Sequence, residues 1–235
     1  MNNVVTDTVK LSKHTLSVLK NFSSLNSNIL IRTGNLINTI TPAKNVVAQA
    51  KVEENFPVEF GVWDLNKFLG TISLFHDPEF CFGEKAVTIK GNNNATVSYY
   101  YSEPRLLTTL TKEIKMPETV VHFELSEETF NDIQKAASVL QLPDLCIQSN
   151  DEKGTIELVV LEKKSSTTNN YLITVGENPD LNSSFKFYLK VENLKILPGD
   201  YSVSVSKNVV SKFENKNCDL IYYIALETDS KHVKD

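Results

Sequence analysis

Three pairs of adjacent acidic residues are the first candidates for chemistry, because clustered carboxylates can hold the metal ions of a nuclease or another hydrolase. The pairs are Glu53-Glu54, Glu127-Glu128 and Asp151-Glu152. Neighbouring residues on a strand or a helix point in different directions, so adjacent acids rarely share one ion. Glu127 and Glu128 also follow a predicted helix start, where negative charge is favourable without a metal. A metal-dependent nuclease or hydrolase is therefore kept only as an alternative.

Histidine and cysteine spacing gives no sign of a metal site or a catalytic nucleophile. No CxxC pair occurs, and no Ser, His and Asp set lies in a GxSxG turn. The chain has only 8 glycines, and neither GxGxxG nor GxxxxGK is present. The sequence thus predicts no catalytic residue, no metal, no cofactor and no enzymatic activity. The residues considered are His14, His76, His122, His232, Cys81, Cys146 and Cys218.

Lysines on predicted helix faces are the more informative feature. Lys13, Ser17, Lys20 and Ser24 follow one another at helical spacing on a helix expected after Ser12. Further isolated cations fall at Lys67, Lys135, Lys190 and Lys195. In a protein of net charge -5 they would form a weakly positive surface that slides along phosphates rather than gripping them. The alternative is an ordinary solvated helix face.

The length of 235 residues suits one large or two small domains. Residues 1–110 hold 10 basic and 9 acidic residues, whereas residues 111–235 hold 14 and 20. Between the halves, the proline-bracketed segment 104–117 has neither strand alternation nor a capped helical pattern. We expect an N-terminal domain at 1–108, a connector at 109–118 and a C-terminal domain at 119–235; the alternative is a hairpin arm within a single domain.

Each half repeats the same order of elements. Ser12 and Ser126 are predicted to cap helices whose apolar positions include Leu16, Leu19, Phe130 and Ile133, and Pro143 follows the second helix. Short helices are expected at 64–69, stopped by Gly70, and at 192–197, stopped by Pro198-Gly199. The expected strands are 28–33, 35–40, 46–52, 60–63, 86–90, 95–101, 145–149, 155–162, 170–175, 185–190, 201–206, 209–214 and 220–227.

These patterns predict an α+β protein with two similar domains, each with antiparallel sheets and two helices on one face. No apolar run approaches the roughly 20 residues that a membrane span requires, so no membrane partner is expected. The isolated cysteines and the absence of a secretory signal favour a reducing cytoplasm.

Four segments resemble the sliding clamps of tailed bacteriophages, which belong to the proliferating cell nuclear antigen superfamily. They occur in the family's order and cover both halves of the chain. The segments are 9–27, which opens VKLSKHT and continues through LKNF to LNS, WDLNKFLG at 63–70, LPGDY at 197–201 and YIALETDS at 223–230.

The resemblance implies a DNA-clamp fold and a homotrimeric ring that encircles duplex DNA and tethers the viral DNA polymerase. It also implies an ATP-driven clamp loader as partner, a role in late transcription, and a location in the cytoplasm of the infected bacterial host. The lysines that would face DNA are Lys10, Lys13, Lys20, Lys67, Lys135, Lys190 and Lys195.

The family also docks short partner peptides in an apolar pocket near the interdomain connector. The residues this implies here are Leu107, Leu110, Ile114, Leu142, Pro143 and Tyr223, although packing in the core is the alternative for each of them. Beside the clamp and the hydrolase, a structural virion protein of the β-sandwich type remains an alternative, because strand-rich repeats also build tails and baseplates.

Overall fold

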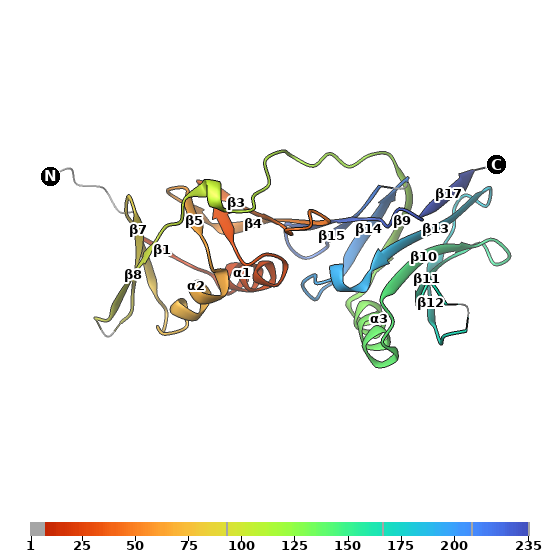
Figure 1. The fold of residues 1–235 in the computed structure, drawn as a ribbon, viewed down its shortest axis with the longest axis horizontal. Coiled ribbons are helices and arrows are strands. Elements are labelled where there is room, and N and C mark those ends of the chain that lie inside the picture. Colours follow the sequence, from red (N-terminus) through yellow and green to blue (C-terminus); the bar gives the residue numbers. More distant parts are fainter. Residues whose placement is uncertain (1–7, 93, 166, 208, 235) are drawn as a thin grey trace. The chain divides into compact units, whose positions relative to one another are not determined.

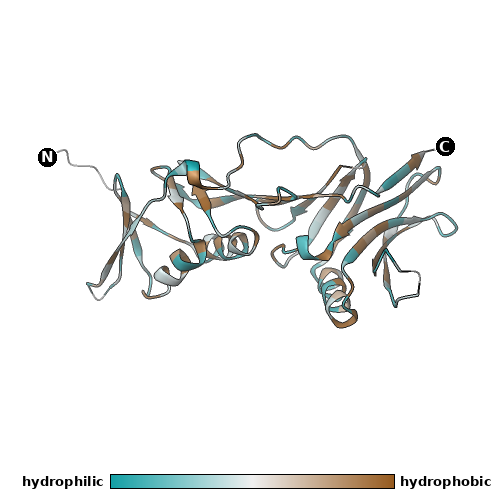
Figure 2. Cartoon of the chain, viewed as in Figure 1, coloured by the Kyte–Doolittle hydropathy of each residue, from teal (hydrophilic) through white to brown (hydrophobic). Residues whose placement is uncertain are grey.

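The computed structural model describes residues 8–92, 94–165, 167–207 and 209–234. The chain divides into two compact units, Met1–Glu113 and Ile114–Asp235. Each contains antiparallel strands and at least one helix (Figure 1). Hydrophobic and hydrophilic residues are interleaved along the strands of both units (Figure 2). The α+β class with antiparallel sheets, as expected from the sequence, is confirmed.

The first unit is built around helix α1 (Lys13–Leu25). The helix begins where expected, because the hydroxyl of Ser12 accepts a hydrogen bond from the backbone N–H of Thr15 at 3.1 Å. Val18, Leu19 and Phe22 are completely buried and pack the helix onto the unit, including strand β4 (Val46–Phe56). The opposite face of α1 remains exposed to solvent.

The strands of the first unit pair antiparallel in three sets. Strands β1 (Thr8–Lys10), β6 (Glu79–Phe82), β7 (Ala86–Lys90) and β8 (Thr96–Tyr100) pair in that order. Strand β2 (Ile29–Ile31) pairs with β5 (Phe60–Val62), and β3 (Gly34–Ile40) pairs with β4. A 3-10 turn, η1 (Pro104–Leu106), follows β8.

The second helix of this unit, α2 (Leu65–Ile72), is longer than expected. Gly70 was predicted to end it, but the helix continues through Gly70 to Ile72. A helical glycine costs only about 1 kcal/mol relative to alanine. Burial of Leu65, Phe68 and Ile72 on one face compensates for that cost.

The second unit contains two sheets and helix α3 (Glu127–Leu140), capped by Ser126 as expected. One sheet has the order β12 (Tyr171–Glu177), β11 (Thr155–Leu161), β10 (Asp144–Asn150), β13 (Ser183–Lys190), β17 (Lys231–Lys234). In the other, β9 (Thr119–Leu125), β14 (Tyr201–Ser206), β15 (Val210–Asn215) and β16 (Leu220–Ala225) are neighbours in that order.

The short helix expected at 192–197 is wrong. The structure has only the 3-10 turn η2 (Val191–Asn193) there, so α3 is the only α-helix among the described residues of this unit. Two tyrosines hold the following segment in a non-helical form. The hydroxyl of Tyr222 accepts from the Leu197 N–H at 3.1 Å, and the Tyr201 hydroxyl donates to the Leu197 carbonyl.

Four strands were not predicted, namely β1, β6, β9 and β17. Three of them are only three or four residues long, so their own sequence carries little alternation. No helix among the described residues is long and apolar enough to cross a membrane.

Candidate nucleic-acid interface and docking residues

The exposed face of α1 carries the predicted cationic stripe. Lys13, Ser17, Lys20 and Ser24 are all exposed, while the residues between them are partly or fully buried. The two lysines are therefore fixed to a rigid helix rather than to a mobile loop. Such a face can contact phosphates without enclosing them.

A buried carboxylate on β4 holds the start of α1 in place. Glu54 is 8% exposed, and its two oxygens accept hydrogen bonds from the Ser12 N–H and the Thr15 hydroxyl. Burial alone raises the pKa of Glu54, but the hydrogen bonds from Thr15 and Ser12 outweigh it and hold the pKa below its ordinary value. Glu54 is thus the charged partner of the N-terminus of α1, and the sequence did not single it out for that role.

Helix α2 packs against α1 in the first unit (Figure 1). Its N-cap is Asp64, whose carboxylate accepts from the Lys67 N–H at 2.9 Å, and the Lys67 side chain is exposed. A groove of about 670 Å³ lies along the two helices and is lined by both Lys13 and Lys20. The fold thus brings the cations of α1 beside α2.

Lys10 differs from the other lysines of the first unit. It lies on β1, and its ammonium is 2.7 Å from the carboxylate of Asp77 and 3.7 Å from that of Glu79. The hydrogen bond to Asp77 raises the pKa of Lys10. Two nearby carboxylates offset its charge, which leaves it less suited than Lys13 or Lys20 to attract a phosphate.

In the second unit, Lys135 is exposed on α3 and Lys195 is exposed just after η2. The two segments are tied together by Gln134, whose side-chain amide donates to the Leu194 carbonyl at 3.0 Å. Lys190, by contrast, forms a 2.6 Å ion pair with Asp144, whose side chain is 1% exposed. The hydrogen bond to Asp144 raises the pKa of Lys190. The positive charge of Lys190 therefore compensates the buried carboxylate of Asp144.

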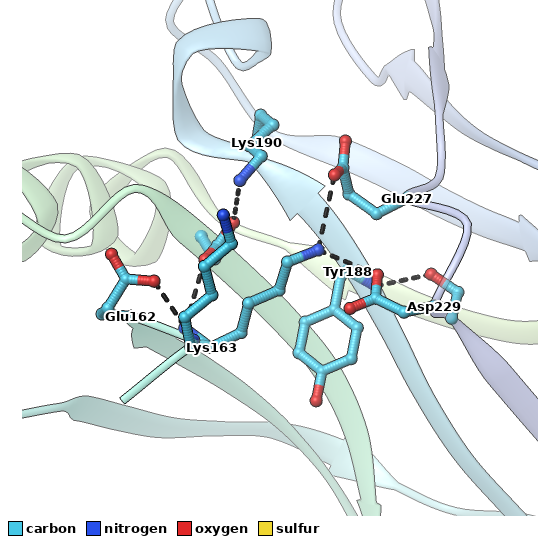
Figure 3. Close-up of polar contacts among 9 residues, drawn as sticks. Glu162, Lys163, Tyr188, Lys190, Glu227 and Asp229 are labelled. Carbon is cyan, nitrogen blue, oxygen red and sulfur yellow. Dashed lines mark hydrogen bonds and ion pairs between the residues drawn. The ribbon is translucent and has the colours of Figure 1, made fainter. Parts of the chain in front are cut away.

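Lys190 belongs to a wider polar cluster that no sequence pattern indicated (Figure 3). Lys163 lies 2.8 Å from Asp229 and 3.4 Å from Glu227, and its ammonium sits 5.3 Å from the centre of the Tyr188 ring. Burial lowers the pKa of Lys163, but the contacts with Asp229 and Glu227 outweigh it and raise the pKa. The cluster fastens the segment after β16 to the β12-β11-β10-β13-β17 sheet.

The six residues expected to form a docking pocket do not belong to one unit. Leu107 is buried beside Gly61, and the Leu110 carbonyl accepts from Arg32 at 3.2 Å, both in the first unit. In the second unit, Leu142 and Tyr223 are buried and two others are half-buried. The half-buried pair is Ile114 and Pro143.

The described residues contain no group of three His, Cys, Asp or Glu side chains that could hold a metal ion. The acid pairs are separated in function as well. Glu54 caps α1, Glu127 lies at the start of α3, and the Asp151 carboxylate accepts from the Ser149 hydroxyl at 2.7 Å.

Comparison with solved structures identifies the class. The chain superposes on the A. fulgidus PCNA, bound to the C-terminal region of FEN-1, with a TM-score of 0.69 and 14% identity, over 95% of this chain and 99% of that one. The fold is therefore that of the DNA clamps, as the sequence resemblance implied.

Sequence comparison gives the family. Residues 10–79 match the family described as DNA polymerase processivity factor, and residues 122–228 match that described as gp45 sliding clamp, C terminal. The sliding clamp of Vibrio phage KVP40 is 32% identical over 93% of this chain and 99% of its own length. That of Escherichia phage RB69 is 30% identical over 95% and 99%. The chain belongs to the sliding clamp family.

Sliding clamps are non-catalytic processivity factors that bind DNA and partner proteins such as a polymerase. The matches with the phage clamps extend through both halves of the chain. They therefore favour the sliding clamp over a structural virion protein.

Proposed function

We propose that three copies of this chain close into a ring around duplex DNA and tether the phage DNA polymerase to its template. The observation that carries this is the set of exposed cations on α1, α2 and α3 in a protein whose net charge is -5. An acidic exterior repels DNA, whereas a few cations on rigid helices attract its phosphates weakly enough for the DNA to slide past. Two domains per chain and three chains would supply six domains to the ring.

The lysines that we propose to contact DNA are a subset of the seven expected ones. Lys10 and Lys190 have carboxylate partners within the chain, so their charges are partly or fully offset. Four of the others are exposed on helices α1, α2 and α3, and the fifth is exposed just after η2. The proposed contacts are Lys13, Lys20, Lys67, Lys135 and Lys195.

We further propose that partner proteins dock through short apolar peptides near the connector. The solved A. fulgidus PCNA carries the C-terminal region of FEN-1, which supports a C-terminal segment as the kind of ligand for this fold. The domain limits that accompany this proposal are 1–108 and 119–235, with a connector at 109–118. The proposed docking residues are Leu107, Leu110, Ile114, Leu142, Pro143 and Tyr223.

An ATP-driven clamp loader would open and close the ring, so the clamp itself would need no nucleotide. A role as co-activator of late transcription and a location in the cytoplasm of the infected host belong to the same proposal. They are supported by the relatedness to clamps of Vibrio and Escherichia phages.

The test of this function begins with mass in solution. Light scattering across a dilution series should give a mass near three times 26.4 kDa that falls on dilution. With the cognate polymerase and loader, the protein should then lengthen the products made on circular DNA, and linearising the DNA should weaken the effect. A monomer at every concentration, or equal products with and without the protein, would contradict the proposal.

A further inference from the structure

The groove along α1 and α2 has an apolar lining that contact with DNA does not explain. Its volume of about 670 Å³ lies within the range of ligand sites in proteins. Duplex DNA presents mainly phosphates and sugars to a protein that does not read its sequence, and these groups need polar partners. The half-buried apolar residues of the groove are Leu11, Leu16, Leu69, Phe75 and Pro78.

Gly70 keeps one side of this groove open. It lies within α2, lines the groove and is exposed. Glycine is among the poorest helix formers, and a Cβ at this position would lie more than 4 Å from the packed neighbours in the described part of the chain. Packing of the first unit therefore does not require a glycine here. The missing side chain instead lets another backbone approach α2 closely.

One end of the groove is held by contacts within the first unit. The ammonium of Lys10, on β1, lies 2.7 Å from the carboxylate of Asp77, which lines the groove. In the segment between α2 and Asp77, the Phe75 N–H donates to the Ile72 carbonyl at 3.1 Å. The wall at this end therefore belongs to the folded unit, and the negative charge of Asp77 is offset by Lys10.

The remaining charge of the groove is positive. Lys13 and Lys20 line it, are exposed, and form no ion pair with the described residues. Asp77 is the one acidic residue among the described residues that line it. The step from Lys13 to Lys20 is about two helical turns, or about 10 Å along α1. A complementary ligand therefore carries apolar groups flanked by two negative charges about 10 Å apart.

We propose that this groove binds an acidic amphipathic helix of a partner protein. The apolar side of that helix packs on Leu16 and Leu69, and its carboxylates pair with the lysines on α1. Gly70 lets the helix lie close to α2. The proposed function assigns Lys13 and Lys20 to DNA as well, so the partner helix and duplex DNA exclude each other. This exclusion rests on the proposed function, whereas binding of the helix to the free protein does not.

Fluorescence anisotropy of a labelled synthetic peptide tests the groove in the absence of DNA. The probe is a helix-forming peptide of about 16 residues, with two glutamates about two turns apart and leucines between them on the same face. It should bind with a dissociation constant on the order of 10 μM, and more weakly as the salt concentration rises. A peptide with glutamine in place of each leucine keeps the charges and is the matched control. Absence of binding at about 1 mM, or equal binding of the two peptides, would overturn the proposal.

Substitutions in the protein locate the binding site of the peptide. Gly70→Leu places a side chain in the open space beside α2 and should weaken peptide binding roughly tenfold or more, while the urea midpoint stays equal or rises because leucine favours a helix more than glycine does. Lys13→Glu and Lys20→Glu should each weaken binding roughly tenfold through repulsion of the carboxylates. Lys51→Glu, at an exposed position on β4 outside the groove, is the matched control. Full binding by Gly70→Leu, or a loss of equal size in Lys51→Glu, would overturn the assignment to this groove.

Protein loaded onto closed circular DNA tests the exclusion separately. After removal of free protein, the loaded protein should bind the leucine peptide roughly tenfold or more weakly than the free protein does, because DNA occupies the same lysines. Linearising the DNA should release the protein and restore binding. Equal binding by loaded and free protein would overturn the exclusion. Failure to load onto circular DNA would contradict the proposed function, whereas peptide binding by the free protein would still support the groove.

Discussion

The ammonium of Lys190 lies 2.6 Å from the carboxylate of Asp144, and the two residues are direct cross-strand partners on β13 and β10. Asp144 is almost fully buried and also accepts from the Lys163 backbone N–H at 3.2 Å. A buried carboxylate needs such partners, because its desolvation is otherwise uncompensated. Lys190 is therefore part of the framework of the second unit rather than a free cation.

Lys190→Met should accordingly lower the stability of the protein. Loss of the ammonium leaves Asp144 buried without its counter-charge, and breaking such a pair costs about 3 kcal/mol or more of unfolding free energy. Urea unfolding followed by circular dichroism measures the change. Lys186→Met, at an exposed lysine on the same strand, should shift the free energy by less than about 0.5 kcal/mol. Equal losses in the two variants would contradict the structural role of Lys190.

Glu54 should make the protein sensitive to acid. Its pKa in the folded state lies below the ordinary value of 4.5, so the folded state favours the charged form. The stability that this contributes is fully present above pH 4.5 and is lost as the pH falls through the folded pKa. The urea midpoint of the unsubstituted chain should therefore fall more steeply below about pH 4.5 than that of Glu54→Gln. Parallel pH profiles for the two chains would show that Glu54 is not the group responsible.

Cys146 should resist alkylation in the folded protein. Burial raises the pKa of its thiol to about 12, so almost no thiolate exists near neutral pH. Cys81 and Cys218 are partly exposed and serve as internal controls. Iodoacetamide at pH 8 followed by peptide mass spectrometry should label Cys81 first and Cys146 only after denaturation. Early labelling of Cys146 would mean that its strand opens readily in the native state.

The elements that the sequence predicted well are those set by local interactions. Ser12 and Ser126 cap their helices through bonds to residues three positions on, which a short window reveals. Strand β9, in contrast, was not predicted, although its residues alternate and Val121 and Phe123 are buried. It begins directly after the expected connector, which ends at residue 118. The segment after the 3-10 turn at Val191–Asn193 is bound at Leu197 by the hydroxyls of Tyr201 and Tyr222, and no local pattern shows these contacts.

The candidate site was only partly predictable for the same reason. The helical spacing of Lys13 and Lys20 places both on one face, and the structure leaves both exposed. The pairing of Lys190 with Asp144 joins residues 46 apart and depends on the register between two strands. Sequence patterns specify which face a side chain takes, but not which charge lies opposite it.

Lys13 and Lys20 offer the most direct test of DNA contact. If each neutralises a phosphate, alanine at either position should lower the slope of log affinity against log salt by about 0.9 and weaken binding to all sequences alike. Lys51 is the matched control, since it is exposed on β4 but lies on the strand face opposite Glu54 and α1. Retention on a closed circular duplex, measured across salt concentrations, gives the slopes. Unchanged slopes for Lys13→Ala and Lys20→Ala, or a drop of equal size for Lys51→Ala, would mean that DNA does not pass along this face of α1.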